Sequence, residues 1–183
     1  MKTEPTPFHI TEISSPLGSM AAAANSKGVY LLEFIENNSA KKLLSDIDKR
    51  VNLSDSEQEN PHLIQLKNEL DAYFKGTLKK FTVPLDLQGS DFQKKVWMEL
   101  LTIPFGETRS YEQQTAKLGD LKAIRAVASA NGKNRISIVV PCHRVIGKNG
   151  SLTGYAGGLD KKLWLLDFES KHSGKSFQTS LEF

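Results

Sequence analysis

Residues 110–131 read SYEQQTAKLGDLKAIRAVASAN, and this stretch decides how the second half of the chain is expected to fold. Ser110 and Gln113 have the spacing of a capping box, which predicts a helix that Gly119 ends. Asp120 can cap a second helix, LKAIRAVASA, which an Asn-Gly pair follows. Two short helices joined by about three residues indicate a helix-turn-helix.

The two faces of the second helix differ in chemistry when it is plotted at about 100° per residue. Four apolar residues share the face that we expect to be buried: Ala123, Ala126, Val127 and Ala130. The opposite face carries Lys122, Arg125 and Ser129. Small residues next to Arg125 would let the helix backbone approach a partner closely. Alternatively, the helix packs in a core and Arg125 is only solvated.

The sequence upstream predicts a smaller α+β unit. Expected strands cover residues 8–13, 19–25 and 28–35, the last two joined by a hairpin at NSKG. Expected helices include Ala40–Ile47 and Leu63–Phe74, separated by a polar loop over residues 52–61, and residues 81–87 are expected to be extended. Gly89-Ser90 is the expected boundary, since Ser90 and Gln93 form another capping box, whose helix must stop before Pro104. We therefore expect an N-terminal α+β domain (1–88), a C-terminal helix-turn-helix domain (89–170) and a polar tail (171–183).

Charge and composition narrow the classes of function. The 183 residues carry a net charge of +3, and the excess of basic residues is confined to residues 91–183. That bias indicates a polyanion such as nucleic acid, although a solvated basic face would look the same. No stretch resembles a signal peptide or a membrane span. The single cysteine excludes an internal disulfide and favours the cytoplasm, and the four scattered histidines suggest no metal site.

Cys142, the only cysteine, lies in the sequence VVPCHRVIGKNG, residues 139–150. The β-branched run ISIVV (136–140) predicts a buried strand that Pro141 ends, which would place the thiol just beyond a strand end. A nucleophilic thiol must ionise, and with an ordinary pKa near 8.5 only about 3% does so at pH 7. His143 could act as the base, directly or through a water. Inert packing of the cysteine is the alternative.

A third residue favours chemistry. LDKKLWLLDFES (159–170) is apolar on nearly every face, which predicts a buried helix with Glu169 pointing inward. A buried carboxylate needs a partner, and a histidine that activates a thiol needs an orienting acceptor. A Glu–His–Cys set would satisfy both needs, unless Glu169 lies at a frayed and solvated helix end. The loop GYAGG (154–158) lets a flat ligand approach the backbone closely, but it is not a nucleotide phosphate loop.

These motifs together resemble the O6-alkylguanine-DNA alkyltransferases, also called methylated-DNA–protein-cysteine methyltransferases. The resemblance covers Phe92 to Glu169 and rests on motifs in the order FQxxVW, IPxGxxxSY, RAVxxAN, NxxxIVV before PCHRVIG, GYAGG and WLLxxE. It implies a ribonuclease-H-like α/β roll in the N-terminal domain and a winged-helix-like C-terminal domain that carries the active cysteine. It also implies DNA repair by irreversible, single-turnover transfer of an alkyl group from O6-alkylguanine, and possibly O4-alkylthymine, in duplex DNA.

The resemblance assigns roles to individual residues. Cys142 would accept the alkyl group, with His143 as base, Glu169 orienting His143, and Asn134 bracing the turn. Arg125 would enter the duplex through the minor groove, and Tyr111 would help to rotate the damaged nucleotide and donate to its guanine. Further DNA contacts are expected from Lys122, Ala126, Ser129, Lys133, Arg135 and Lys148. The base pocket would be formed by Tyr111, Val145, Tyr155, Ala156 and Gly157.

This sequence departs from the family pattern at two of these positions. Ala156 replaces a serine found in some members, which leaves only its backbone N–H for O6, and Arg135 replaces a common proline. The zinc ligands of some members are missing, so we expect neither a metal nor a cofactor. We expect a monomer that binds double-stranded DNA and no membrane. The alternatives are a catalytically silent binder of alkylated bases, a helix-turn-helix regulator, or a cysteine hydrolase.

Overall fold

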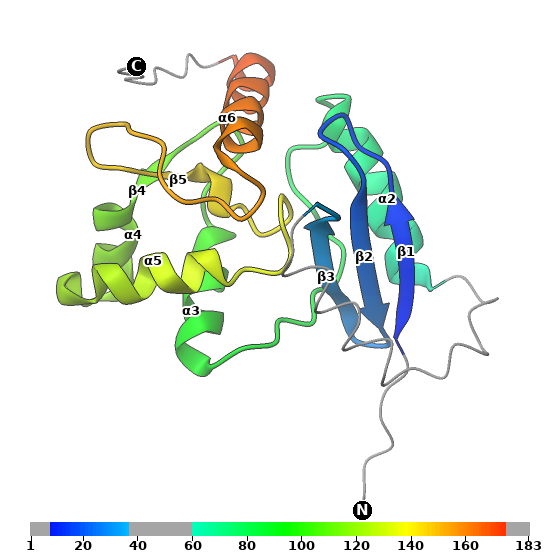
Figure 1. The fold of residues 1–183 in the computed structure, drawn as a ribbon, viewed down its shortest axis with the longest axis horizontal. Coiled ribbons are helices and arrows are strands. Elements are labelled where there is room, and N and C mark those ends of the chain that lie inside the picture. The colour runs from blue at the N-terminus through cyan, green and yellow to red at the C-terminus, as the bar shows by residue number, and fades with distance from the viewer. Residues whose placement is uncertain (1–7, 37–59, 175–183) are drawn as a thin grey trace, which may run out of the picture. The chain divides into compact units, whose positions relative to one another are not determined.

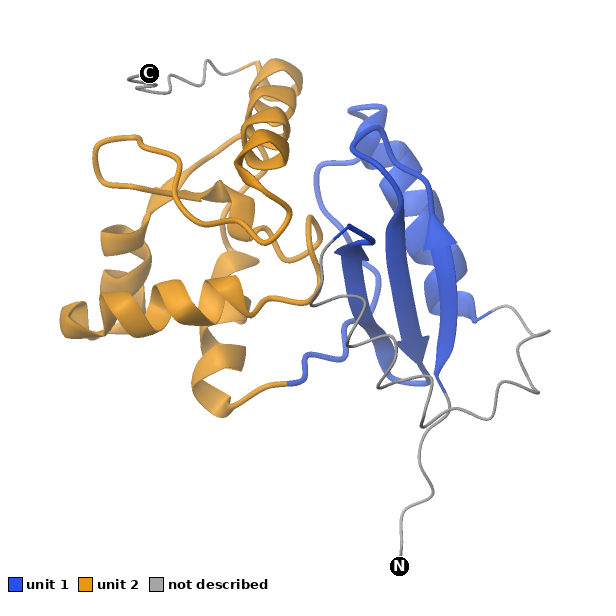
Figure 2. Cartoon of the chain, in the orientation of Figure 1, with its two compact units in different colours: residues 1–88 blue, residues 89–183 orange. Residues whose placement is uncertain are grey.

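The computed structural model describes residues 8–36 and 60–174 (Figure 1). The chain divides into two compact units, Met1–Gln88 and Gly89–Phe183 (Figure 2). The helix expected near residues 40–47 and most of the loop expected at 52–61 lie outside the described residues.

The first unit is built on an antiparallel sheet whose strand order is β1-β2-β3, with helix α2 packed against it (Figure 1). The elements are β1 (His9–Ile13), β2 (Met20–Asn25), β3 (Gly28–Phe34) and α2 (Pro61–Phe74). Every residue of the central strand β2 is buried, and small alanines fill four of its six positions. The predicted hairpin and the helix over Leu63–Phe74 are both confirmed.

The segment that leaves α2 returns to the edge of this sheet. Val29 donates its amide to the Pro84 carbonyl and accepts from the Asp86 amide, both at 2.8 Å, so this segment runs parallel to β3. Gly28 makes the approach possible, because a Cβ atom there would lie 2.4 Å from the Pro84 oxygen. The segment expected to be extended, residues 81–87, therefore adds an isolated parallel bridge at Leu85 to the edge of the sheet.

The second unit consists of short helices around two parallel β-bridged segments (Figure 1). The helices are α3 (Asp91–Leu100), α4 (Tyr111–Leu118), α5 (Ile124–Gly132) and α6 (Leu159–Ser173), with 3-10 turns η2 (Leu121–Ala123) and η3 (Cys142–Arg144). The strands β4 (Arg109–Ser110) and β5 (Val145–Ile146) pair in parallel. This pairing places the start of α4 beside the residues that follow the cysteine.

The helix-turn-helix is confirmed, with α4 and η2–α5 as its two arms. Both predicted capping boxes form, and Gly119 ends α4 in the left-handed conformation at φ 91°. Asp120 caps as expected, although it opens the 3-10 turn η2 before α5 begins. Gln114 and Asn131 exchange two buried amide hydrogen bonds, of 3.2 and 2.7 Å, which fix α4 against α5.

The buried face of α5 is narrower than the periodicity predicted. Val127 and Ala130 are buried, but Ala126 is exposed and Ala123 is only half-buried. The 3-10 turn before α5 rotates the preceding residues away from the ideal helical positions, which accounts for Ala123. Exposure of Ala126 leaves a small side chain on the outer surface next to Arg125.

The strand predicted for residues 136–140 is wrong. These residues are buried, but they form consecutive turns, with the Val140 amide bonded to the Ile136 carbonyl at 3.0 Å. Ile138 adopts a left-handed φ of 71°, which is unusual for a β-branched residue. Asn134 causes the departure from a strand, because its side chain binds both ends of the run, at the Ile136 amide and the Val140 carbonyl.

Helix α6 is confirmed but is less buried and longer than predicted. Leu165 and Leu166 are buried, whereas Leu159 is 46% and Trp164 36% exposed. The helix continues to Ser173, three residues into the segment expected to be a tail. Glu169 points inward and has no accessible surface, as predicted.

Candidate active site

Cys142 opens the 3-10 turn η3, so the thiol is carried by a tight turn and not by a strand end. The residue is 8% exposed. Asn134 donates its Nδ2 to both the Val140 carbonyl, at 2.8 Å, and the Cys142 Sγ, at 3.2 Å. A hydrogen-bond donor beside the sulfur favours its anionic form, because the bond is stronger to a charged acceptor. Asn134 thus fixes the turn and contacts the sulfur at the same time.

His143 and Glu169, for which the sequence predicts an orienting contact, lie within hydrogen-bond distance of each other. His143 Nε2 lies 2.8 Å from Glu169 Oε1, and neither residue has accessible surface. An ionised carboxylate can only accept, so Nε2 carries the proton and Nδ1 has the free lone pair. His143 Nδ1 has no hydrogen-bond partner within the described part of the chain. The imidazole is therefore arranged to accept a proton at Nδ1.

Two further groups that the sequence analysis missed bind the same carboxylate. Arg144 donates Nε to Oε2 and Nη2 to Oε1 of Glu169, both at 2.9 Å, and the Gly106 amide donates to Oε2 at 3.0 Å. A Cβ atom on Gly106 would lie 2.4 Å from the Ser173 Cβ, so only glycine brings this amide close enough. Both residues belong to motifs, IPxG and CHR, that could have identified them.

The pKa values of His143 and Glu169 are both lowered. Burial lowers the pKa of His143 and outweighs the attraction of Glu169, which acts to raise it. Burial alone would raise the pKa of Glu169, but the charges and hydrogen bonds of His143 and Arg144 hold it well below 4.5. A neutral imidazole beside an ionised carboxylate is the state that a general base requires.

A cavity of about 850 Å³ borders the helix-turn-helix, and neither Cys142 nor His143 is among the described residues that line it. One lining residue, Tyr155, has its ring centre 6.5 Å from that of the His143 imidazole. Its lining includes the predicted pocket residues Tyr111, Tyr155 and Ala156, together with Arg125 and Lys148. Tyr111 Oη donates to the Thr153 carbonyl at 3.4 Å, and burial raises the pKa of this phenol, which therefore stays protonated as a donor. Arg125 on α5 and the aromatic residues of the pocket thus border one space.

The other predicted contacts lie outside the cavity lining. Gly157 is half-buried, and Val145 is buried with its carbonyl bound to Lys162 Nζ at 2.6 Å. The predicted DNA-contacting residues Lys122, Ser129, Lys133 and Arg135 are all exposed. Lys148 forms an exposed ion pair with Glu112 at 2.9 Å, which the sequence did not predict.

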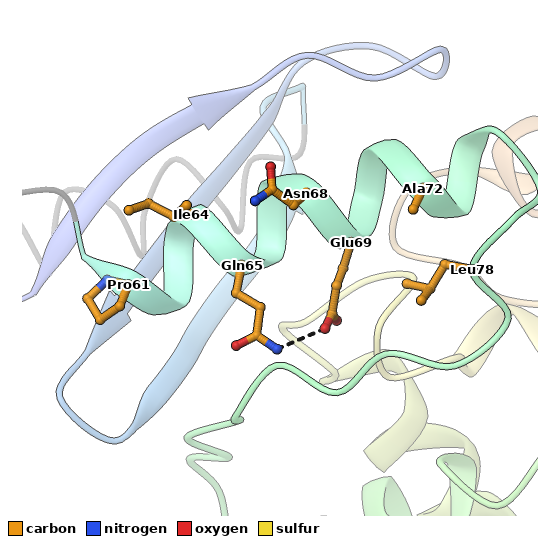
Figure 3. A pocket seen from close by; sticks show the side chains of 7 residues that line it. All are labelled: Pro61, Ile64, Gln65, Asn68, Glu69, Ala72 and Leu78. Carbon is orange, nitrogen blue, oxygen red and sulfur yellow. Dashed lines mark hydrogen bonds between the residues drawn. The ribbon is translucent and has the colours of Figure 1, made fainter.

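A second cavity, of about 400 Å³, lies on α2 in the first unit and is less suited to chemistry (Figure 3). Its one titratable group, Glu69, already accepts hydrogen bonds from Gln65, from the Thr82 amide and hydroxyl and from the Val83 amide. Within residues 8–36 and 60–174, no three potential ligand side chains cluster as a metal site would need. No helix in the same ranges is long and apolar enough to cross a membrane.

Comparison with known proteins decides the family. Residues 91–171 match the DNA binding domain of 6-O-methylguanine DNA methyltransferase, and residues 9–87 match the ribonuclease-like domain of the same enzyme. This chain belongs to the 6-O-methylguanine DNA methyltransferase family. The expected ribonuclease-like and DNA-binding domains are thereby confirmed.

Relatives of known name and structure agree with this assignment. The methylated-DNA–protein-cysteine methyltransferase of Methanosarcina barkeri is 42% identical over 161 residues, which cover 87% of this chain and 96% of the relative. The crystal structure of Mycobacterium tuberculosis O6-methylguanine methyltransferase is 40% identical, with a TM-score of 0.77 over 90% of this chain and 94% of the other. A structure of the M. tuberculosis protein in complex with DNA matches with a TM-score of 0.76, 40% identity and the same coverage.

Proposed function

We propose that this family member repairs DNA by transferring the alkyl group of O6-alkylguanine to Cys142. The observation that carries the proposal is the position of the only thiol in the chain. Cys142 contacts Asn134 and is followed directly by a buried histidine that Glu169 orients. Tyr155, which lines the cavity beside the helix-turn-helix, has its ring centre 6.5 Å from that of the His143 imidazole. Inert packing of the thiol would need none of these partners.

The exposed face of the helix-turn-helix supports duplex DNA as the substrate. The O6 atom lies inside the duplex, so the nucleotide must be rotated out at a cost of a few kcal/mol. Arg125 borders the cavity and is exposed, and we assign it to the space that the extruded base leaves. Lys122 and Lys133 are exposed on the same unit and would contact phosphates, which adds affinity independent of sequence.

The proposed chemistry uses the groups around Cys142 together with residues of the neighbouring loop and helix α4. The proton of the Cys142 thiol passes to His143 Nδ1, directly or through a water. The sulfur attacks the alkyl carbon, the carbon–sulfur bond forms and the carbon–O6 bond breaks. Guanine leaves with the electron pair of that bond and takes up a proton, for which the protonated Tyr111 phenol is a suitable donor. The Ala156 amide would stabilise the charge that develops on O6.

The product explains why one protein molecule repairs one lesion. A thioether is not hydrolysed as an acyl-enzyme is, so Cys142 is consumed, and we propose that a monomer performs a single event. A cysteine hydrolase would instead turn over many times on an acyl substrate without DNA. A silent binder or a regulator would not need Cys142 at all.

The mass of the protein tests the proposal. We expect incubation with duplex DNA that contains one O6-methylguanine to add a single methyl group per chain, located on Cys142, with no second event when fresh DNA is added. The matched control is Cys142→Ser, which should bind the same DNA and gain no mass. An unchanged mass of the wild-type protein would contradict the proposal, and so would repeated turnover.

A further inference from the structure

Lys162 on α6 is a charged residue with no accessible surface. Fully buried lysines are rare, because the amine loses its hydration and needs replacement partners. Lys162 Nζ donates to the carbonyls of Val145 at 2.6 Å and Thr153 at 2.7 Å, and the Gly154 carbonyl lies at 3.4 Å. An ammonium has three protons and no lone pair, so three acceptor oxygens match its charged form.

The partners of Lys162 connect two parts of the candidate site. Val145 begins β5 directly after the turn that carries Cys142. Thr153 and Gly154 line the cavity and lead into the loop that presents Tyr155. One side chain therefore joins the segment behind the thiol to the wall of the cavity. The Lys162 Nζ atom also lies 6.0 Å from the centre of the Tyr111 ring.

The charge of Lys162 acts on two titratable groups of the turn η3, Cys142 and His143. It favours an anionic sulfur at Cys142 and disfavours a protonated imidazole at His143, whose pKa it helps to lower. Burial lowers the pKa of Lys162 to about 8, and the interaction with Cys142 opposes this shift. Lys162 is therefore charged near neutral pH but loses its proton well before an ordinary lysine does.

We propose that Lys162 is a positioning residue that holds the cavity loop against β5 and supplies the positive charge that favours the Cys142 thiolate. The inference rests on the proposed function only in taking Cys142 as the reacting group. Neither of its tests uses DNA, so its failure and the failure of alkyl transfer are separate results.

The first test measures alkylation of the single thiol by iodoacetamide across a range of pH. We expect Lys162→Met to slow alkylation at pH 7 by about three- to tenfold and to move the pH midpoint up by roughly half a unit to one unit. The matched control is Lys161→Met, the same substitution one residue earlier on α6, which should leave rate and midpoint unchanged. Lys162→Arg, which keeps the charge, should keep the midpoint close to that of the wild type. If Lys162→Met reacts like Lys161→Met, the proposal is overturned.

The second test needs no change at Lys162 and so does not depend on whether Lys162→Met folds. Coupling between two titrating groups is reciprocal, so removal of the thiol must change the titration of the amine. We expect the NMR titration of the Lys162 side chain to have its midpoint near pH 8 in the wild type. In Cys142→Ser this midpoint should move lower, because the neighbouring anion is lost. An identical midpoint in the two proteins would disprove the electrostatic role.

Discussion

The two sides of the second unit satisfy their polar groups in opposite ways. Around Glu169, both carboxylate oxygens are bound by buried donors from His143, Arg144 and Gly106. On the outer surface, the Arg125 side chain makes no hydrogen bond or ion pair with any residue in the ranges 8–36 and 60–174, and Lys122 and Ser129 are exposed beside it. Both carboxylate oxygens of Glu169 are thus bound within the protein, whereas the Arg125 guanidinium is bound by no side chain among the described residues.

This difference indicates that the Glu169 side acts on the reaction and the Arg125 side acts on DNA binding. Buried donors and acceptors that are already in place need not reorganise when charge moves, so they act on the reaction itself. Exposed cations gain little until a polyanion displaces its counterions, so they act on binding and depend on salt. Mutations on the two sides should therefore differ in size, in pH dependence and in salt dependence.

The largest effect is expected from Glu169→Gln. Among the described residues, Glu169 is the anion bound to the buried cation Arg144, so its loss should lower the free energy of unfolding by about 3 kcal/mol. It should also slow alkylation of Cys142, because the imidazole of His143 loses its orienting acceptor. The measurements are urea unfolding and the rate of methyl transfer. Asp167→Asn, an exposed carboxylate on the same helix, is the matched control and should change neither.

The decrease of the free energy of unfolding at acid pH tests the same role of Glu169. The pKa of Glu169 is depressed in the folded protein, so its stabilising effect is complete above the ordinary value of 4.5 and is lost as the pH falls below it. Wild-type stability should therefore decrease more steeply than that of Glu169→Gln between about pH 5 and pH 3. If the free energy of unfolding depended on pH in the same way in both proteins, Glu169 would not be ionised in the folded protein.

An intermediate effect, confined to DNA, is expected from Arg125→Ala. Arg125 is not among the residues bound to Glu169, so the rate of reaction with free O6-benzylguanine should stay within about twofold of wild type. Repair in duplex DNA should fall by at least about tenfold, since an unfilled gap leaves the cost of base extrusion uncompensated. Both rates can be measured on one preparation, with Lys171→Ala, an exposed cation on α6, as the control. If the rates on duplex DNA and on free O6-benzylguanine fell equally, Arg125 would not act specifically on DNA.

Helix ends and helix faces were predicted correctly from the sequence more often than the backbone conformation around Cys142. Capping boxes and the glycine at the end of α4 depend on neighbouring residues, so they could be read directly, and the periodicity of α6 placed Glu169 inside. The strand at 136–140 failed because Asn134 binds both ends of that run, an interaction that β-propensity does not include. Lys162 was missed because a lysine in a helix is usually solvated, and only the fold shows three carbonyls around it.

The smallest effect is expected from Glu112→Gln, on the exposed side. Glu112 and Lys148 border the cavity and form an ion pair whose side chains are 46% and 80% exposed, so the pair itself contributes little to stability. A DNA phosphate must compete with Glu112 for Lys148, and removal of the acid should raise affinity for duplex DNA by about two- to threefold at low salt. The gain should disappear at high salt, and Asp167→Asn, which breaks a similar exposed pair with Lys171, should produce none. Glu112→Gln keeps the capping box of Ser110 and Gln113 but removes the acidic residue in the first turn of α4, so urea unfolding of the variant should accompany the affinity measurement. Fluorescence anisotropy across a salt series measures this difference, and unchanged affinity would place Lys148 outside the DNA contact.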